Sequence, residues 1–277
     1  MMDLGGKSKI SLKAPAKVNL QLKIVGRFPN GTHDLKMIMV KLELADKLEL
    51  EIGGKDIRIE CDTLPSDSSN LVWRAADLVR KESGKKFGLI ARLQKKIPIG
   101  AGLGGGSSDA ASTLIGLNAL LDLRWDESKL RSLAVRLGAD VPFFIVKGPQ
   151  RVEGFGDILS PMEVPKIPLI LVTPDFPVST AEAYSWYDIS PLTRSGGNAR
   201  RADFENDLEE VVFPRYPVLA EIKKRLGQTG ALGTLMSGSG STVFACFKSE
   251  TSRDQGYEIL MKDIPYGWWV CKTATLD

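Results

Sequence analysis

The 277-residue sequence contains one histidine, His33, and only three cysteines. A single imidazole removes most metal sites and catalytic triads that depend on histidine. The cysteines are odd in number and widely spaced, and no CxxC pair occurs, so neither a disulfide framework nor a zinc knuckle gains support. We expect Cys61, Cys246 and Cys271 to be small buried hydrophobic residues in a reducing compartment.

The sequence also lacks long apolar runs and an excess of charge of one sign. Lys and Arg number 37 against 34 Asp and Glu, which gives a net charge of +3. This excess of basic residues is too small to predict a nucleic-acid-binding protein. The longest strongly apolar stretches, such as residues 167–172, are far shorter than the roughly 18 residues of a membrane span. The N-terminal residues have no apolar signal-peptide core. We therefore expect a soluble cytoplasmic protein that binds neither nucleic acid nor membrane.

Strand and helix patterns occur in blocks rather than in strict alternation, which predicts an α+β fold rather than a doubly wound sheet. Alternating or continuous apolar residues predict strands at residues 18–24, 89–93, 169–173 and 242–247. A further extended run ends at Leu42 and Leu44, and apolar residues alternate with charged ones over residues 47–52. Helical spacing predicts helices that begin at Asn70, Ser107, Asp126 and Val218, the third of which stops at Gly138. The consecutive strands of the first third favour antiparallel pairing.

The proline-dense segment at residues 161–168 predicts a boundary between two domains, residues 1–163 and 164–277. A length of 277 residues agrees with about two domains at roughly 150 residues each. Residues 194–198 are predicted to form an exposed loop. No internal repeat or low-complexity tract is found.

The densest signal for chemistry is a glycine-rich loop between a predicted strand and a predicted helix. It consists of Pro98, Ile99, Gly100, Ala101, Gly102, Leu103, Gly104, Gly105, Gly106, Ser107 and Ser108. Glycine permits positive φ and close approach of a ligand to the backbone. Successive N–H groups beside the positive end of a helix form an anion-binding concavity. The loop is therefore predicted to bind phosphate.

Three other interpretations of this loop are weaker. A plain connecting loop with a serine N-cap does not explain five glycines, which are costly to order. A dinucleotide motif matches formally at Gly100, Gly102 and Gly105, but the acidic residue expected about 20 residues later is not evident. A Walker A loop fails, since Gly6-Lys7-Ser8 would need a glycine at Met1, and protein-kinase signatures are absent.

Two further stretches could join the loop. Lys17 and Asn19 lie at the start of the first clear strand, and Asp140 is the one acid among apolar neighbours in LGADVPFF. Taken alone, Asp140 is most simply the N-cap of a short helix, and Lys17 a solvated strand residue.

Together these motifs resemble the GHMP kinase superfamily. The matching stretches are APAKVNL at 14–20, NGTHDL at 30–35, GLGGGSSDAA at 102–111, LGADVPFF at 137–144, Gly154–Gly156 and the late glycine loop Ser237–Ser241. They cover both halves of the chain in the family's order. The match is most similar to the branch of the superfamily that acts in the non-mevalonate isoprenoid pathway.

The resemblance implies an N-terminal domain like ribosomal protein S5 domain 2 and a ferredoxin-like C-terminal domain, with the active site between them. It implies transfer of the γ-phosphate of ATP, with Mg²⁺, to the C2 hydroxyl of a cytidine-diphosphate-linked methylerythritol. Asp140 matches the general base and Lys17 its cationic partner, while residues 98–108 match the ATP-phosphate loop. Asn19, His33 and Tyr184 are the expected substrate contacts. No residue is assigned as a metal ligand, and a monomer or weak homodimer is expected.

The sequence departs from the family at Thr32, where the family usually has a tyrosine that stacks on cytosine. Thr32 cannot stack, whereas His33 could still hydrogen-bond the edge of the base. A second stacking aromatic is expected within residues 178–186, with Tyr184 as first candidate and Trp186 as second. Each of the two could instead be a core or interface residue.

Two alternatives to this function stay open. The first is another GHMP kinase with a mevalonate-, homoserine- or sugar-type substrate. His33 and the triple glycine before Ser107 disfavour it, because other branches typically carry a shorter loop. The second is a catalytically inactive nucleotide-binding member of the family. The presence of both Lys17 and Asp140 argues against that, since a protein that only binds needs no base.

Overall fold

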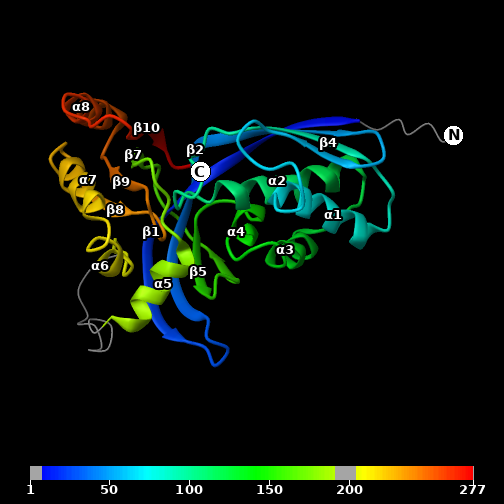
Figure 1. Cartoon of the computed structure of the whole chain (residues 1–277), viewed down its shortest axis with the longest axis horizontal. Coiled ribbons are helices and arrows are strands. Elements are labelled where there is room, and N and C mark those ends of the chain that lie inside the picture. The colour runs from blue at the N-terminus through cyan, green and yellow to red at the C-terminus, as the bar shows by residue number, and fades with distance from the viewer. Residues whose placement is uncertain (1–7, 191–203, 277) are drawn as a thin grey trace. The chain divides into compact units, whose positions relative to one another are not determined.

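The computed structural model describes residues 8–190 and 204–276, so that the predicted loop at 194–198 lies outside the described residues. The chain divides into two compact units, each built from separate segments. Unit 1 comprises residues 1–16, 44–97 and 104–147, and unit 2 comprises residues 17–43, 98–103 and 148–277. Two long strands, β1 (Lys9–Arg27) and β2 (His33–Ile52), each contribute to both units (Figure 1).

Unit 1 combines a small piece of sheet with four helices. Its further elements are β3 (Ile57–Glu60), α1 (Leu71–Ser83), β4 (Leu89–Gln94), α2 (Gly105–Leu120), α3 (Glu127–Val135) and α4 (Val141–Ile145). β4 pairs antiparallel with the second half of β2 and parallel with β3. The four helices gather together, with α1 packed on α2, and both α2 and α3 packed on α4 (Figure 1).

Local sequence explains where the helices of unit 1 begin and end. The Asn70 side chain accepts a hydrogen bond from the Val72 N–H, and the Asp126 side chain accepts one from the Lys129 N–H. Both predicted N-caps are therefore confirmed. Helix α1 ends at Gly84, whose φ of 66° is the left-handed conformation that glycine adopts most easily.

Two predicted helix limits need correction. Helix α2 begins at Gly105 rather than at Ser107, because Gly104 takes a φ of 69° and turns the chain two residues earlier. Helix α3 ends at Val135 rather than just before Gly138. There the Arg136 N–H donates to the Leu133 carbonyl and the Leu137 N–H to the Ala134 carbonyl, so that the last turn tightens to three-residue spacing.

Unit 2 contains an antiparallel four-stranded sheet in the order β10-β7-β9-β8. Its further elements are β5 (Gln150–Gly154), β6 (Ile158–Pro161), β7 (Pro168–Thr173), α5 (Thr180–Ile189), α6 (Glu209–Val212), α7 (Pro217–Gly227), β8 (Gly233–Met236), β9 (Val243–Cys246), α8 (Glu250–Met261) and β10 (Trp269–Ala274). Every residue of the central strands β7 and β9 is buried. Helix α7 contacts β8 and β9, and α8 contacts β7 and β10. Separately, β5 pairs with the first half of β2 and with β6.

The mixture of sheets and blocks of helices confirms the predicted α+β class. The predicted division between residues 163 and 164 stays a prediction, since each compact unit draws on several segments of the chain. The three cysteines are free, but only Cys246 is buried, where burial raises the pKa of its thiol to about 12. Cys61 and Cys271 are half-buried, contrary to expectation. Among the described helices, none has both the length and the apolar character needed to cross a bilayer.

Candidate active site

The tip of the glycine-rich loop, residues 98–103, packs in unit 2 against the late glycine loop, Ser237–Ser241. The Ser237 hydroxyl donates to the Gly102 carbonyl at 3.0 Å. The Thr242 N–H donates to the Ala101 carbonyl at 3.2 Å. Gly102 has a φ of 75°, and a Cβ on it would lie 2.2 Å from the Ser237 carbonyl oxygen. Only glycine fits this contact.

The other end of the glycine-rich loop becomes the first turn of α2 in unit 1. The N–H groups in the first turn of a helix have no hydrogen-bond partner within that helix. The N-cap of α2 is Gly104, which has no side chain that could accept hydrogen bonds from them. These donors and the helix dipole suit an anion. The Ser108 hydroxyl and the Asp109 Oδ1 are buried and have no hydrogen-bond partner among the described residues. Buried polar atoms are rarely left in this state.

Lys17 and Asn19 lie two residues apart on β1 and therefore on the same face of the strand. They are 4% and 1% exposed, and the Lys17 Nζ donates to the Asn19 Oδ1 at 2.6 Å. The Lys17 N–H also donates to the Leu103 carbonyl at 2.9 Å. Gly238 of the late loop is close enough that a Cβ on it would lie 3.3 Å from the Lys17 Nζ. Lys17 is thus a buried residue beside both glycine loops and not a solvated one.

The late loop is held by a residue that the sequence analysis did not select. The Asn206 side chain donates from Nδ2 to the carbonyls of Met236 at 2.8 Å and Gly238 at 2.7 Å. It also accepts from the Leu208 N–H. Backbone contacts between Leu22 and residues 205–207 attach this segment to β1. Asn206 is 5% exposed and fixes the loop that lies on Lys17.

Asp140 lies in unit 1 at the N-cap position of α4, whose five residues are all buried. Its backbone is helical, and among the described residues its side chain makes no capping bond to α4. The simple N-cap interpretation is therefore not supported by its geometry. Asp140 itself is only partly buried. The buried helix α4 that follows fixes the position of the Asp140 backbone, from which the carboxylate extends.

His33 lies in unit 2 at the start of β2, next to α5. Its Nε2 is 2.8 Å from the Asp188 Oδ1, and its ring stacks on Tyr184 with centroids 4.7 Å apart and planes 27° apart. Tyr187 meets the same imidazole edge-on at 6.5 Å. The pKa of Tyr187 is raised to about 12, first by burial and then by nearby carboxylates such as Asp207. The structure thus brings two predicted substrate contacts, His33 and Tyr184, together.

The two remaining residues of this region have different surroundings. The Thr32 hydroxyl donates to the Asn30 Oδ1 at 2.7 Å within an exposed turn, in which Gly31 has a φ of 87°. Trp186 faces the Arg215 guanidinium at 4.6 Å and the Tyr216 ring at 6.1 Å. Trp186 therefore belongs to a packing cluster with Arg215, and Tyr184 stays the better candidate for contact with a base.

Three charged residues form a buried cluster at the flanks of the glycine-rich loop in unit 1. The Lys95 Nζ donates to Asp46 and, at 2.8 Å, to Asp109. Their side chains are 7%, 0% and 1% exposed, respectively. Burial is the main cause that raises the pKa of Asp109 to about 7, and the Lys95 charge opposes it. Sequence reasoning missed this cluster, because Asp46 is distant from the loop in sequence.

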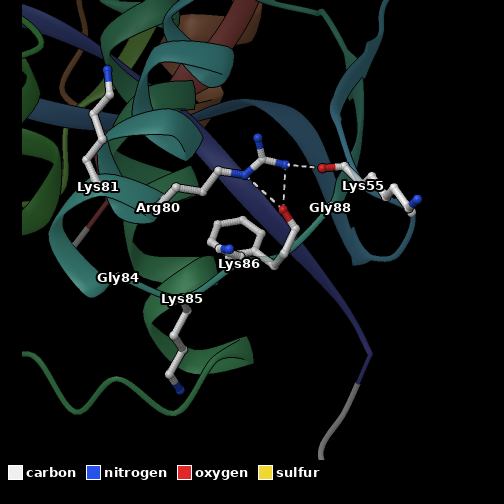
Figure 2. Close-up of a pocket in the computed structure, with 9 residues that line it drawn as sticks. Lys55, Arg80, Lys81, Gly84, Lys85, Lys86 and Gly88 are labelled. Carbon is white, nitrogen blue, oxygen red and sulfur yellow. Dashed lines mark hydrogen bonds between the residues drawn. The ribbon is translucent and has the colours of Figure 1, made fainter.

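Unit 1 also contains a cavity of about 510 Å³ lined by basic residues. The Arg80 guanidinium donates to the carbonyls of Lys55 and Phe87 and so ties the end of α1 to the segments before β3 and before β4 (Figure 2). The ammonium groups of Lys81 and Lys85 point away from each other (Figure 2). Since the charges do not converge, we assign no ligand to this cavity.

The described side chains form no cluster that is typical of a metal site made by the protein alone. Within residues 8–190 and 204–276, no three His, Cys, Asp or Glu side chains gather as a metal site. Any ion bound here would have to take ligands from hydroxyls, single carboxylates or substrate oxygens.

Comparison with known proteins places the chain in a family. Residues 70–148 match the GHMP kinases N terminal domain, and residues 192–263 match the GHMP kinases C terminal domain. A relative from Citrifermentans bemidjiense, named 4-diphosphocytidyl-2-C-methyl-D-erythritol kinase, is 42% identical over 97% of this chain and 99% of its own length. A relative of the same name from Geobacter sulfurreducens is 44% identical over 91% of this chain and 95% of its own.

Solved structures agree with this assignment. A crystal structure of 4-(cytidine 5'-diphospho)-2C-methyl-D-erythritol kinase has a TM-score of 0.81 at 33% identity, covering 97% of this chain and all of the other. A homoserine kinase from Cytophaga hutchinsonii reaches a TM-score of 0.73 at 19% identity, over all of this chain and 97% of its own, which shows the shared fold alone. The chain therefore belongs to the GHMP kinase family and, within it, to the group named 4-diphosphocytidyl-2-C-methyl-D-erythritol kinase.

Proposed function

We propose that the chain transfers the γ-phosphate of ATP to the C2 hydroxyl of 4-diphosphocytidyl-2-C-methyl-D-erythritol, a step of the non-mevalonate pathway to isoprenoid precursors. The observation that carries this proposal is the near-full-length identity of about 42% with a relative of that name. The two glycine loops packed beside Lys17 give it a physical basis, because phosphoryl transfer depends mainly on positioning and charge neutralisation.

In the proposed reaction, the Asp140 carboxylate takes the proton of the C2 hydroxyl. The freed oxygen bonds to the γ-phosphorus, the bond to the β,γ-bridging oxygen breaks, and ADP leaves. An alcohol needs a base within hydrogen-bond reach for this step. Lys17 is the proposed cationic partner that stabilises both the carboxylate and the transferring oxygens. The buried bond from Lys17 to Asn19 supports this role, since it fixes the direction of the ammonium group.

Asn19 remains a proposed substrate contact, although its side chain already has two partners. Its Oδ1 accepts from Lys17, and its Nδ2 faces the Met37 Sδ at 3.4 Å. Residues 98–108 are proposed to hold the ATP phosphates through the N–H groups of the loop and of the first turn of α2.

Mg²⁺ fits the residues at the start of α2. The Ser108 hydroxyl and the Asp109 Oδ1 are buried oxygens without partners among the described residues, and Mg²⁺ prefers oxygen ligands shared with substrate phosphates. We propose that these two residues hold it. When bound, the ion would neutralise charge on the β- and γ-phosphates.

At the other end of the substrate, His33 and Tyr184 are proposed to recognise cytosine. The stacked pair offers a π-face and a ring nitrogen in one place. The Asp188 carboxylate at the His33 Nε2 orients the imidazole, which leaves Nδ1 for the base edge.

A coupled assay of ADP release tests this function. The diphosphocytidyl substrate should give ATP-dependent turnover, whereas mevalonate, homoserine and galactose should give none. Turnover with one of those three instead would favour another GHMP kinase, and ATP binding without any turnover would favour an inactive member. A cytoplasmic location and a monomer or weak homodimer are proposed as well, the latter to be checked by light scattering.

A further inference from the structure

The buried charged cluster of Asp46, Lys95 and Asp109 contacts both flanks of the glycine-rich loop. Asp46 Oδ1 accepts the N–H groups of Lys96 at 2.5 Å and Ile97 at 2.9 Å, which directly precede the loop. The Lys95 ammonium donates to the other oxygen of Asp46 and, at 2.8 Å, to Asp109 in α2, just after the loop. A single set of charges therefore joins the chain entering the loop to the chain leaving it.

Close packing at the helix start links Lys95 to the loop itself. A Cβ on Gly105, the first residue of α2, would lie 3.1 Å from the Lys95 Nζ and 3.1 Å from the Ile97 Cγ2. The ammonium group thus lies close to the first turn of α2, whose N–H groups are proposed to bind a phosphate. A displacement of Lys95 would change the position of that first turn.

Stability alone is a poor explanation for this cluster. Burying three charged groups carries a desolvation cost that well-packed apolar residues of similar volume would avoid. Buried ionic groups can instead specify one arrangement of the backbone. Here the specified arrangement is that of the two flanks, which limits the freedom of the short glycine-rich segment between them.

We propose that Lys95, held between Asp46 and Asp109, is a positioning residue that presets the phosphate loop for ATP. The proposal deepens the proposed function and rests on it for the identity of the nucleotide. Lys95 acts through the loop and through Asp109, and need not touch the phosphates itself.

Calorimetric titration of ATP into the full chain tests the proposal. Lys95→Met should raise the Kd for ATP roughly 10- to 100-fold, which corresponds to about 1.4–2.8 kcal/mol. The KM for the cytidine substrate should stay within about threefold, as expected for an interaction confined to one ligand. Asp46→Asn, which keeps an oxygen for Lys95, should cause a smaller loss.

A matched control separates positioning from stability. Val79→Ala removes a fully buried side chain of α1 in the same unit and should lower the melting temperature. It should leave the Kd for ATP unchanged. If Lys95→Met lowers only the melting temperature, or if both variants weaken ATP equally, the positioning role is overturned.

The titration also distinguishes the two proposals, because ATP binding requires no second substrate. Weaker ATP binding in Lys95→Met, together with no turnover of the diphosphocytidyl substrate by the parent chain, would support the positioning role and reject the proposed substrate. Unchanged ATP binding with normal turnover of that substrate would reject the positioning role alone.

Discussion

The proposed phosphate-binding end and the proposed base-binding end rest on different kinds of contact, backbone packing at the first and side-chain contacts at the second. At the phosphate end, Gly102 meets the Ser237 carbonyl so closely that a single Cβ would be blocked. At the base end, His33 depends on one contact with Asp188 and on ring stacking with Tyr184. Backbone geometry tolerates few substitutions, whereas stacking side chains can be exchanged at moderate cost. We therefore expect substitutions at the proposed base-binding end to be tolerated better than substitutions in the glycine-rich loop.

The largest expected effect is a loss of turnover without a loss of ATP binding, which distinguishes catalysis from binding at the proposed phosphate end. Asp140→Asn should lower turnover by roughly two to four orders of magnitude, the range for loss of a general base, and leave ATP binding nearly intact. Asp77→Asn is a suitable control, because Asp77 is an ion-paired carboxylate of α1 in the same unit. Steady-state assays with calorimetry would measure both. Turnover within about threefold of the parent would remove Asp140 from the mechanism.

The next effect tests the claim that backbone geometry defines the phosphate end. Gly102→Ala should weaken ATP at least tenfold, because its Cβ would lie 2.2 Å from the Ser237 carbonyl and its φ is 75°. In Gly227→Ala, at the end of α7 in the same unit, the Cβ would meet no atom within 4 Å, and ATP affinity should change little. Replacing Gly104, whose φ is 69°, by valine should likewise abolish ATP binding in a folded protein. Equal affinities for the Gly102 and Gly227 variants would contradict this account.

The base end should respond more moderately and only toward the second substrate. Stacking on a base contributes about 1–3 kcal/mol, so Tyr184→Ala should raise the KM for the cytidine substrate roughly 5- to 150-fold with little change for ATP. Trp186→Ala should have a smaller effect, because Trp186 packs against Arg215. Thr32→Tyr should tighten binding of this substrate if the pocket has kept its shape. If neither Tyr184→Ala nor Trp186→Ala changes this KM, the proposed cytosine site is wrong.

The smallest effect concerns an ion pair between α1 and α3 that belongs to neither end. Hydrogen bonds from Lys129 and Arg136 lower the pKa of Glu82 to about 2 from the usual 4.5. Its contribution to stability is therefore fully present above pH 4.5 and is lost as the pH falls toward 2. Glu82→Gln should lower the melting temperature slightly at pH 6, and the difference should shrink near pH 3. A difference that is equal at both pH values would exclude this linkage.

Local patterns made much of the fold and part of the site predictable. The caps Asn70 and Asp126 act within three residues of themselves, so the sequence alone shows them. The glycine loop is visible for the same reason. The start of α2 differs from the sequence prediction because the positive φ of Gly104, and not a serine cap, begins the helix.

Contacts between distant segments could not be derived in this way. The Asn206 side chain donates to the Gly238 carbonyl, and Lys95 pairs with Asp46. In both cases the two residues are far apart in sequence, and no periodic pattern connects them. The motif that contains Asn206, FENDLE, gave no chemical reason to single it out. Such residues are recognised only when their donors and acceptors are followed in the folded chain.

The division of the chain into interleaved segments has a consequence for synthesis on the ribosome. All segments of unit 1 have been synthesised by residue 147, whereas residues 35–39 of β2 pair with residues 150–154 and belong to unit 2. At about 5–20 residues per second, this part of β2 waits on the order of ten seconds for that partner. During that time it presents an apolar strand edge on which other nascent chains could add. Slow translation before residue 150 should thus promote aggregation of this chain, and a chaperone that covers β2 should suppress it.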